Sequence, residues 1–220
     1  MKTRTLILSA VLIFSLCAAN LYAAEQREVK RSYLGLAFGL NLGQFIGDNA
    51  DAAEFYGGGE KKMRLGLAVG AFAHLGIGNY FALEPQVLYS QKGAKYGDAF
   101  PGWGDELTLI LDYVEVPVLA RIYITNSPKI NIFGGGYFGY LLSAKYKYSE
   151  IGYEEEGDFL IQPEDIDYGL VLGAGGAFPT STVILRIDLK YSLGLAKIWD
   201  MPPNDDIRNG VLSILASIGF

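Results

Sequence analysis

The fold of this chain is decided by the stretch VILRIDLKYSLG, residues 183–194. Apolar or aromatic residues occupy every second position, and between them lie Arg186, Asp188, Lys190 and Ser192. Successive side chains of a β-strand point to opposite faces of the sheet, so one face of this segment is apolar and the other is polar. The pattern predicts a strand whose two faces lie in very different surroundings.

The same period of two recurs along the whole chain. Each repeat is about as long as a tilted membrane-spanning strand, which needs roughly ten residues. One face of each segment is almost unbroken in its apolar character, and the opposite face mixes small and polar residues. We identify eight such segments, at residues 33–43, 63–75, 80–92, 111–124, 130–146, 166–178, 183–194 and 211–220.

The connections between these segments alternate in length. Short connections follow the second, fourth and sixth segments. Long connections follow the others, at about 44–62, 93–110, 147–165 and 195–210. An even number of strands with short turns at one end and long loops at the other is typical of an outer-membrane barrel. The sequence therefore predicts an all-β, eight-stranded, antiparallel up-and-down transmembrane barrel, with both termini at the periplasmic end and the long loops outside the cell.

A soluble, lipocalin-like barrel would also have eight strands, but its apolar face would line the interior. Its outer face would be dense in lysine and glutamate, whereas the polar faces here are rich in glycine, alanine and serine. This composition favours lipid outside and a crowded lumen inside. Aromatic residues near the expected strand ends suit two interfacial girdles, namely Tyr89, Tyr140, Tyr168 and Tyr191 outside and Phe81, Phe178 and Phe220 on the periplasmic side.

The first 23 residues predict a cleavable signal peptide, which leaves residues 24–220 as the barrel domain. A basic start is followed by an apolar run that ends at the small residue Ala23. The only cysteine, Cys17, falls in this segment, so we expect no disulfide or thiolate metal site in the mature chain. Cleavage removes two basic residues and no acid, which takes the formal net charge from −6 to −8. This charge argues against a nucleic-acid partner.

Charged residues on the polar faces predict a network inside the barrel. If the third and fourth segments form a hairpin centred on 101–104, Glu84 lies opposite Arg121 and Ser90 lies opposite Glu115. The complete predicted network consists of Glu84, Glu115, Arg121, Arg186, Asp188 and Lys190. We favour a structural plug over an ion pathway, because the interior of an eight-stranded barrel is just wide enough to be filled by side chains.

Two prolines interrupt the predicted strands. Pro85 and Pro117 lack the N–H that a ladder needs, and a closed barrel has no free edge on which to place them. We therefore expect bulges or local breaks in the ladder at these positions.

No catalytic motif, cofactor site or metal site is predicted. The only histidine, His74, lies on a polar face, and a satisfied lumen or turn histidine is a better interpretation than a catalytic base. Residues 148–167 contain eight acidic side chains, which could hold Ca²⁺ but lack the spacing of an EF-hand loop. A solvated, self-repelling loop is the favoured interpretation of this segment.

Several blocks of the sequence are similar to a known family. The blocks LEPQVLYSQKGAK (83–95), LDYVEVPVLARIYI (111–124), GGYFGYLLSAK (135–145) and DYGLVLGAGGAF (167–178) resemble the PorT-like outer-membrane β-barrels of Bacteroidetes. The resemblance covers residues 31–220. It implies an integral outer-membrane protein without known enzymatic activity, and a link to protein secretion or envelope biogenesis through the family's namesake. The terminal Phe220 resembles the signal that the barrel-assembly machinery reads.

These observations predict a non-enzymatic outer-membrane barrel with a plugged lumen that needs no cofactor. It would act through its extracellular loops or through envelope partners, among lipid and lipopolysaccharide. The alternative is a narrow pore for ions or small solutes. The sequence identifies neither a specific ligand nor an oligomeric state.

Overall fold

The computed structural model describes residues 32–47, 50, 60–97, 105–125, 129–150, 153–158, 163–180, 182–199 and 206–220. The predicted signal peptide lies outside these residues. Within them, no helix is long and apolar enough to cross a membrane.

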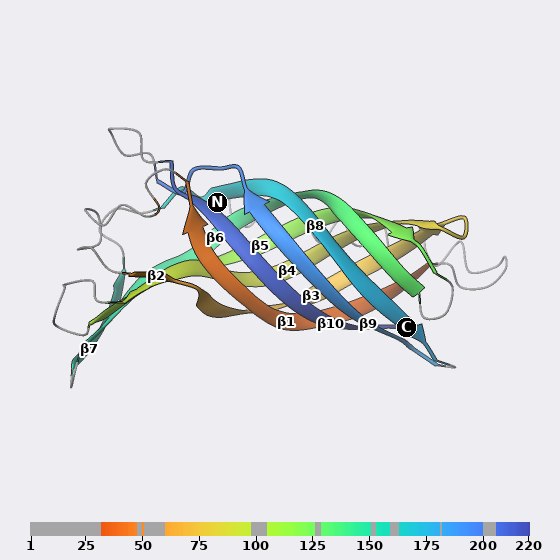
Figure 1. Cartoon of the computed structure of the whole chain (residues 1–220), viewed down its shortest axis with the longest axis horizontal. Coiled ribbons are helices and arrows are strands. Elements are labelled where there is room, and N and C mark those ends of the chain that lie inside the picture. The colour runs from red at the N-terminus through yellow and green to blue at the C-terminus, as the bar shows by residue number, and fades with distance from the viewer. Residues whose placement is uncertain are drawn as a thin grey trace.

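Eight antiparallel strands close into a barrel (Figure 1). The strands are β1 (Ser32–Ile46), β3 (Arg64–Ile77), β4 (Phe81–Gly97), β5 (Glu106–Tyr123), β6 (Lys129–Glu150), β8 (Ile166–Pro179), β9 (Ile184–Gly194) and β10 (Arg208–Gly219). Each of them pairs with the next of the eight, and β10 pairs with β1 to close the ring. The predicted eight-stranded up-and-down barrel is confirmed.

The barrel carries its apolar side chains outside and its charges inside. On β9, Leu185, Ile187 and Leu189 are 47%, 59% and 50% exposed, whereas the charged residues between them are at most 4% exposed. A water-soluble barrel has the opposite arrangement, because exposing this much apolar surface to water is unfavourable. The lipocalin-like alternative is therefore wrong.

Large aromatic side chains lie exposed near the two ends of the wall. Phe81, Phe178 and Phe220 are exposed at the end that carries the short turns, and Tyr168 and Tyr191 are exposed toward the other end. The chain end is held in the wall, because the Phe220 N–H donates a hydrogen bond to the carbonyl of Leu34 on β1, at 2.9 Å. This distribution is typical of interfacial aromatic girdles.

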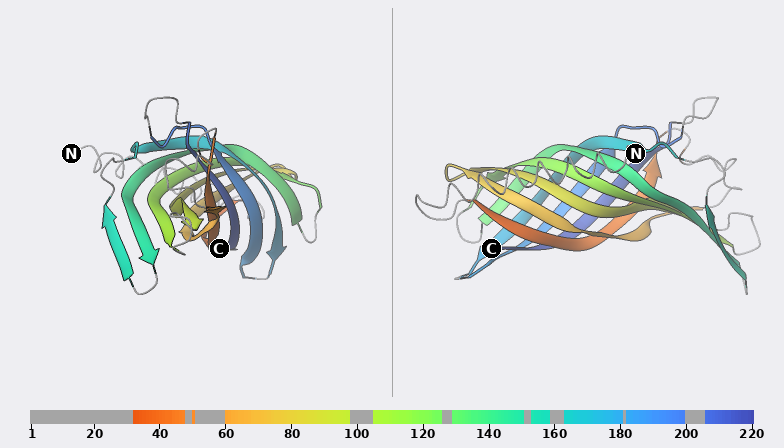
Figure 2. Two further views of the ribbon diagram at one scale, coloured as in Figure 1. Left: turned by 60° about the vertical axis from the view of Figure 1, so that its left-hand side comes forward. Right: turned by 180° about the vertical axis from the view of Figure 1, so that it is seen from behind.

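One side of the barrel extends beyond the other. β4, β5 and β6 contain 17, 18 and 22 residues, against 11 in β9 and 12 in β10. Two further strands lie on this extension, where β2 (Glu60–Lys62) pairs with β4 and β7 (Tyr153–Asp158) pairs with β6 (Figures 1 and 2). The interpretation of 148–167 as a loop is therefore wrong in part, because residues 148–150 belong to β6, residues 153–158 form β7, and residues 166 and 167 begin β8.

The prolines cause local breaks, as predicted. Pro85 leaves a gap in the ladder with β3, and Pro117 leaves a gap in the ladder between β4 and β5, with the same register on both sides of each gap. The register shift of the β5–β6 ladder lies elsewhere, between Asp112 and Tyr113, where Leu142 is the extra residue of β6. From that point β6 turns the opposite set of side chains toward the interior.

Candidate functional site

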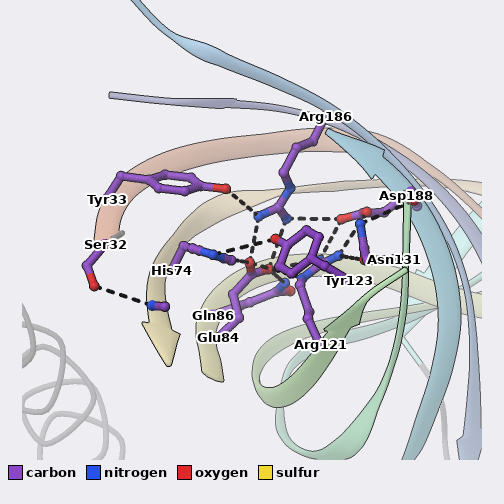
Figure 3. A network of polar contacts seen from close by, with 12 residues as sticks. Ser32, Tyr33, His74, Glu84, Gln86, Arg121, Tyr123, Asn131, Arg186 and Asp188 are labelled. Atoms are coloured by element: carbon purple, nitrogen blue, oxygen red, sulfur yellow. Dashed lines mark hydrogen bonds and ion pairs between the residues drawn. The ribbon is translucent and has the colours of Figure 1, made fainter. Parts of the chain in front are cut away.

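Glu84 on β4 is the hub of a polar layer near the short-turn end of the lumen (Figure 3). Its side chain is 0% exposed. Arg121 on β5 donates to it from Nη2 at 2.9 Å and from Nε at 3.1 Å. Arg186 on β9 donates from Nη1 at 2.5 Å and from Nη2 at 2.9 Å. One carboxylate therefore receives two guanidinium groups, each through two hydrogen bonds.

Asp188 is the second carboxylate of this layer. Arg121 Nη2 lies 2.6 Å from its Oδ2, and Arg186 Nη2 lies 3.0 Å from the same oxygen. Asn131 on β6 accepts a further hydrogen bond from Arg121 Nη1 at 2.8 Å. Two acids and two guanidinium groups thus alternate across the lumen, which stabilises charges that would each be costly to bury alone.

The contact between Glu84 and Arg121 forms in a register that differs from the predicted one. The sequence placed the two residues opposite each other, but Glu84 pairs with Leu119, and Ala82 pairs with Arg121. The predicted hairpin register is therefore wrong by two residues. Both side chains still point into the lumen, because a shift of two preserves the facing of every residue.

His74 on β3 belongs to the same layer. Its Nδ1 lies 3.1 Å from Glu84 Oε2, and its ring stacks on Tyr33 with centroids 4.5 Å apart. Tyr123 packs edge-on against the same ring, with centroids 5.9 Å apart. The histidine is only 5% exposed, so its surroundings are those of a packed structural residue.

A second polar layer lies closer to the long-loop end. Lys92 on β4 forms ion pairs with Glu115 on β5 and with Asp167 on β8, the latter at 2.8 Å. Asp167 also accepts hydrogen bonds from the Tyr137 hydroxyl at 3.1 Å and from Asn209 Nδ2 at 2.9 Å. The sequence interpretation missed Lys92 and assigned Asp167 to the acidic loop. Each lies an even number of residues from a lumen-facing residue of its own strand, Glu84 for Lys92 and Val171 for Asp167. The alternation in the sequence could therefore have placed both in the lumen.

Lys190 lies between the two layers and differs from the other buried charges. It is 4% exposed, and no hydrogen bond or ion pair joins its ammonium to another described residue. With Lys190 included, the two layers contain equal numbers of acidic and basic side chains. The acids are Glu84, Glu115, Asp167 and Asp188, and the bases are Lys92, Arg121, Arg186 and Lys190. The charges of these two layers therefore balance.

Apolar clusters pack among the polar layers. Tyr33, Ala37, Phe72 and Leu88 form one cluster beside the Glu84 layer, where the centroid of the Phe72 ring lies 4.3 Å from Arg186 Cζ. At the long-loop end a larger cluster includes Trp199 from the segment after β9, whose ring packs edge-on against Phe45 on β1 with centroids 5.5 Å apart. The interior thus consists of stacked apolar and polar layers.

The acidic segment is partly neutralised by its neighbour strand. Glu156 pairs with Lys145 at 2.9 Å, and Glu154 pairs with Lys147 at 3.0 Å. The hydrogen bond from Lys145 lowers the pKa of the exposed Glu156 carboxyl and raises that of Lys145. Among the described residues, no group of three or more side chains is arranged to hold a metal ion.

A comparison with protein families gives a match over most of the chain. The model of the outer membrane protein beta-barrel domain matches residues 22–200. No curated protein matches the sequence.

Several solved structures are similar to this chain. The attachment invasion locus protein Ail of Yersinia pestis is 17% identical, with a TM-score of 0.43 over 86% of this chain and 99% of that one. Neisserial surface protein A is 13% identical, with a TM-score of 0.44 over 85% of this chain and 97% of the other. The outer membrane protein AlkL is 12% identical, with a TM-score of 0.45 over 89% and 93%. At these identities the likeness concerns the fold alone.

Proposed function

The chain belongs to the outer membrane protein beta-barrel domain family, and we propose that it is a non-enzymatic barrel whose lumen is closed by its own side chains. It is an integral protein of the bacterial outer membrane. With the lumen closed, its work is done by the segments that extend beyond the membrane on the long-loop side. This proposal separates the chain from barrels that act as channels.

The observation that carries the proposal is the contact between Glu84 and Arg186. Three strands separate β4 from β9 in either direction around the ring, so these two side chains come from opposite walls. The two side chains, joined by hydrogen bonds of 2.5 and 2.9 Å, therefore form a bridge across the lumen. A hydrated ion would have to break this bridge and then pass the apolar cluster around Trp199.

The position of His74 supports a non-enzymatic role. It is the only histidine of the chain, and its ring is enclosed by Tyr33, Glu84 and Tyr123. A general base must lie within reach of the proton that it removes from a substrate. Substrate could reach this ring only after the polar layer had opened.

Ion efflux from proteoliposomes tests the closed lumen. Vesicles loaded with potassium and containing the full-length protein should lose the ion no faster than protein-free vesicles. An open porin reconstituted in the same way provides the positive control. Efflux that rises in proportion to the amount of barrel would refute the closed lumen and support the alternative of a narrow pore.

The resemblance to PorT-like barrels supplies a second candidate role, in protein secretion or envelope biogenesis. The resembling blocks, such as YVEVPVLA (113–120), belong to the barrel wall, so they support insertion more than they identify a partner. The exposed terminal Phe220 would serve recognition by the barrel-assembly machinery. Photo-cross-linking from the extended wall in native cells would test this role, since recovery of secretion-system components would support it and their absence would oppose it.

A further inference from the structure

Beyond the barrel wall, β6 and β7 form a hairpin whose outer edge is not paired with any other strand that the structure describes. The hairpin pairs from Lys145↔Asp158 to Glu150↔Tyr153, and no other described strand pairs with β7. In an antiparallel ladder, every second residue of an edge strand directs its N–H and C=O away from its neighbour. Figure 2 shows the hairpin standing clear of the rest of the wall. The β7 edge therefore offers backbone hydrogen-bonding groups to another chain.

The β7 edge is strongly acidic. Four of its six residues, Glu154, Glu155, Glu156 and Asp158, are acidic and exposed, and β7 contains no basic residue. Glu154 and Glu156 are held on one face by lysines of β6. Glu155 points to the other face, where it accepts a hydrogen bond from the Tyr153 hydroxyl at 3.1 Å. Glu155 and Asp158 take no part in these two ion pairs.

The charge of the β7 edge selects its occupant. A second copy of the chain that paired edge to edge would place acid beside acid, which destabilises a cross-strand pair. A lysine- or arginine-rich strand would instead meet opposite charge along its length. Tyr153 is 55% exposed, so its ring can contact a lysine or arginine side chain of the bound segment.

We propose that the β7 edge binds an extended, lysine- or arginine-rich segment of an extracellular protein or peptide, which adds to the sheet as a further strand. Backbone hydrogen bonds would supply the pairing, and the acidic side chains would supply the preference for basic sequences. The proposal rests on the proposed function, in which the barrel acts outside its lumen.

A peptide pair tests the backbone pairing. The probe is a ten-residue peptide of alternating lysine and valine, and its binding to the full-length protein in lipid nanodiscs is measured by calorimetry. The comparison peptide has the same sequence with methyl groups on alternate backbone nitrogens, which preserves its charge and removes its N–H donors. We expect the methylated peptide to bind at least about tenfold more weakly. Equal binding of the two peptides, or no binding of either, would overturn the proposal.

A pair of variants tests the location. The Glu155→Lys variant reverses one charge on the face of β7 that is turned away from both lysine ion pairs. The Glu164→Lys variant makes the same charge change at an exposed position beyond β7. We expect about a tenfold loss of affinity in the first variant and a much smaller loss in the second. Equal losses would indicate general attraction to an acidic surface and would refute an edge site.

The two proposals fail separately. Heat-modified mobility on gels first shows that each variant is a folded barrel. A barrel that leaks ions but binds the probe peptide would refute only the closed lumen. A sealed barrel that does not bind the peptide would refute only the edge site.

Discussion

Replacing Glu84 by glutamine removes one negative charge from the centre of the lumen and leaves the shape of the side chain almost unchanged. In the native protein this carboxylate receives four hydrogen bonds from Arg121 and Arg186 and lies 3.1 Å from His74 Nδ1. After the change, the two guanidinium groups share a single carboxylate, that of Asp188. One buried positive charge is then left without compensation.

The cost follows from these contacts. Hydrogen bonds that involve a charged group contribute about 1.5–3 kcal/mol each, but four of them are not additive, and glutamine still accepts two. Removing one partner of a buried ion pair costs about 3–5 kcal/mol, because the remaining charge stays desolvated. We therefore expect Glu84→Gln to lower the free energy of unfolding by about 3–5 kcal/mol.

Urea unfolding in detergent micelles measures this loss, with gel mobility and tryptophan fluorescence, to which the buried Trp199 contributes, as two independent readouts. The matched control is Glu106→Gln, which removes the same charge from a partly exposed pair with Lys95. That variant should change stability by less than about 1 kcal/mol. If Glu84→Gln and Glu106→Gln unfold at the same urea concentration, the buried network does not stabilise the barrel and our reasoning is refuted.

Three further variants probe other parts of the interior. Asp188→Leu removes the other carboxylate from the same two guanidinium groups, so we expect a loss of about 3–5 kcal/mol, and an unchanged urea midpoint would contradict it. Lys92→Met should lower the free energy of unfolding by a similar amount, because it leaves two buried carboxylates without their cation. Lys190→Met breaks no ion pair and should lower it by less than about 1 kcal/mol. A lower urea midpoint for Lys190→Met than for Lys92→Met would be evidence against the two layers. Gly93→Ala should cost at least about 1 kcal/mol, because the φ of Gly93 is 120° and a Cβ there would lie 2.0 Å from the Leu109 carbonyl oxygen. If the Gly93→Ala variant folds and then unfolds at the same temperature as the wild-type protein, the inferred backbone strain is contradicted.

The barrel itself could be predicted from the sequence, because one physical constraint is repeated in every strand. A wall between lipid and a packed lumen requires apolar and polar residues to alternate, and the segment 183–194 shows this almost without exception. Parity then places Arg186, Asp188 and Lys190 on the inside without any knowledge of register. This explains why Glu84 and Arg121 were grouped together although their predicted register was wrong.

The extension above the membrane could not be predicted in the same way. With roughly ten residues expected per strand, the fourth predicted segment begins at Leu111, although the alternation extends back to Leu107. At the extra residue Leu142, the inward-facing positions of β6 change from odd to even numbers. The change interrupts the alternation in the sequence, so the pattern does not show that β6 continues to Glu150. β7 has no apolar alternation of its own, because its partners are the lysines of β6 and not lipid.

The partners of individual charges also depend on three-dimensional detail. Lys92 has the parity of a lumen residue, but only the closed barrel shows that it reaches Asp167 on β8. The sequence grouped Asp167 with the neighbouring acids of the loop, where parity carries no information. Lys190 lies between the two layers, where Glu115 and Asp188 attract it electrostatically although it forms no direct ion pair with a described residue.

The closed lumen is the central claim of this account, and single-channel recording tests it most directly. The purified full-length barrel is inserted into a planar lipid bilayer at high salt, and insertion is verified by recovering folded protein from the membrane. We predict no conductance steps at any voltage that the bare bilayer withstands, because Arg186 and Glu84 join opposite walls. Steady, uniform conductance steps from the wild-type protein would contradict the account.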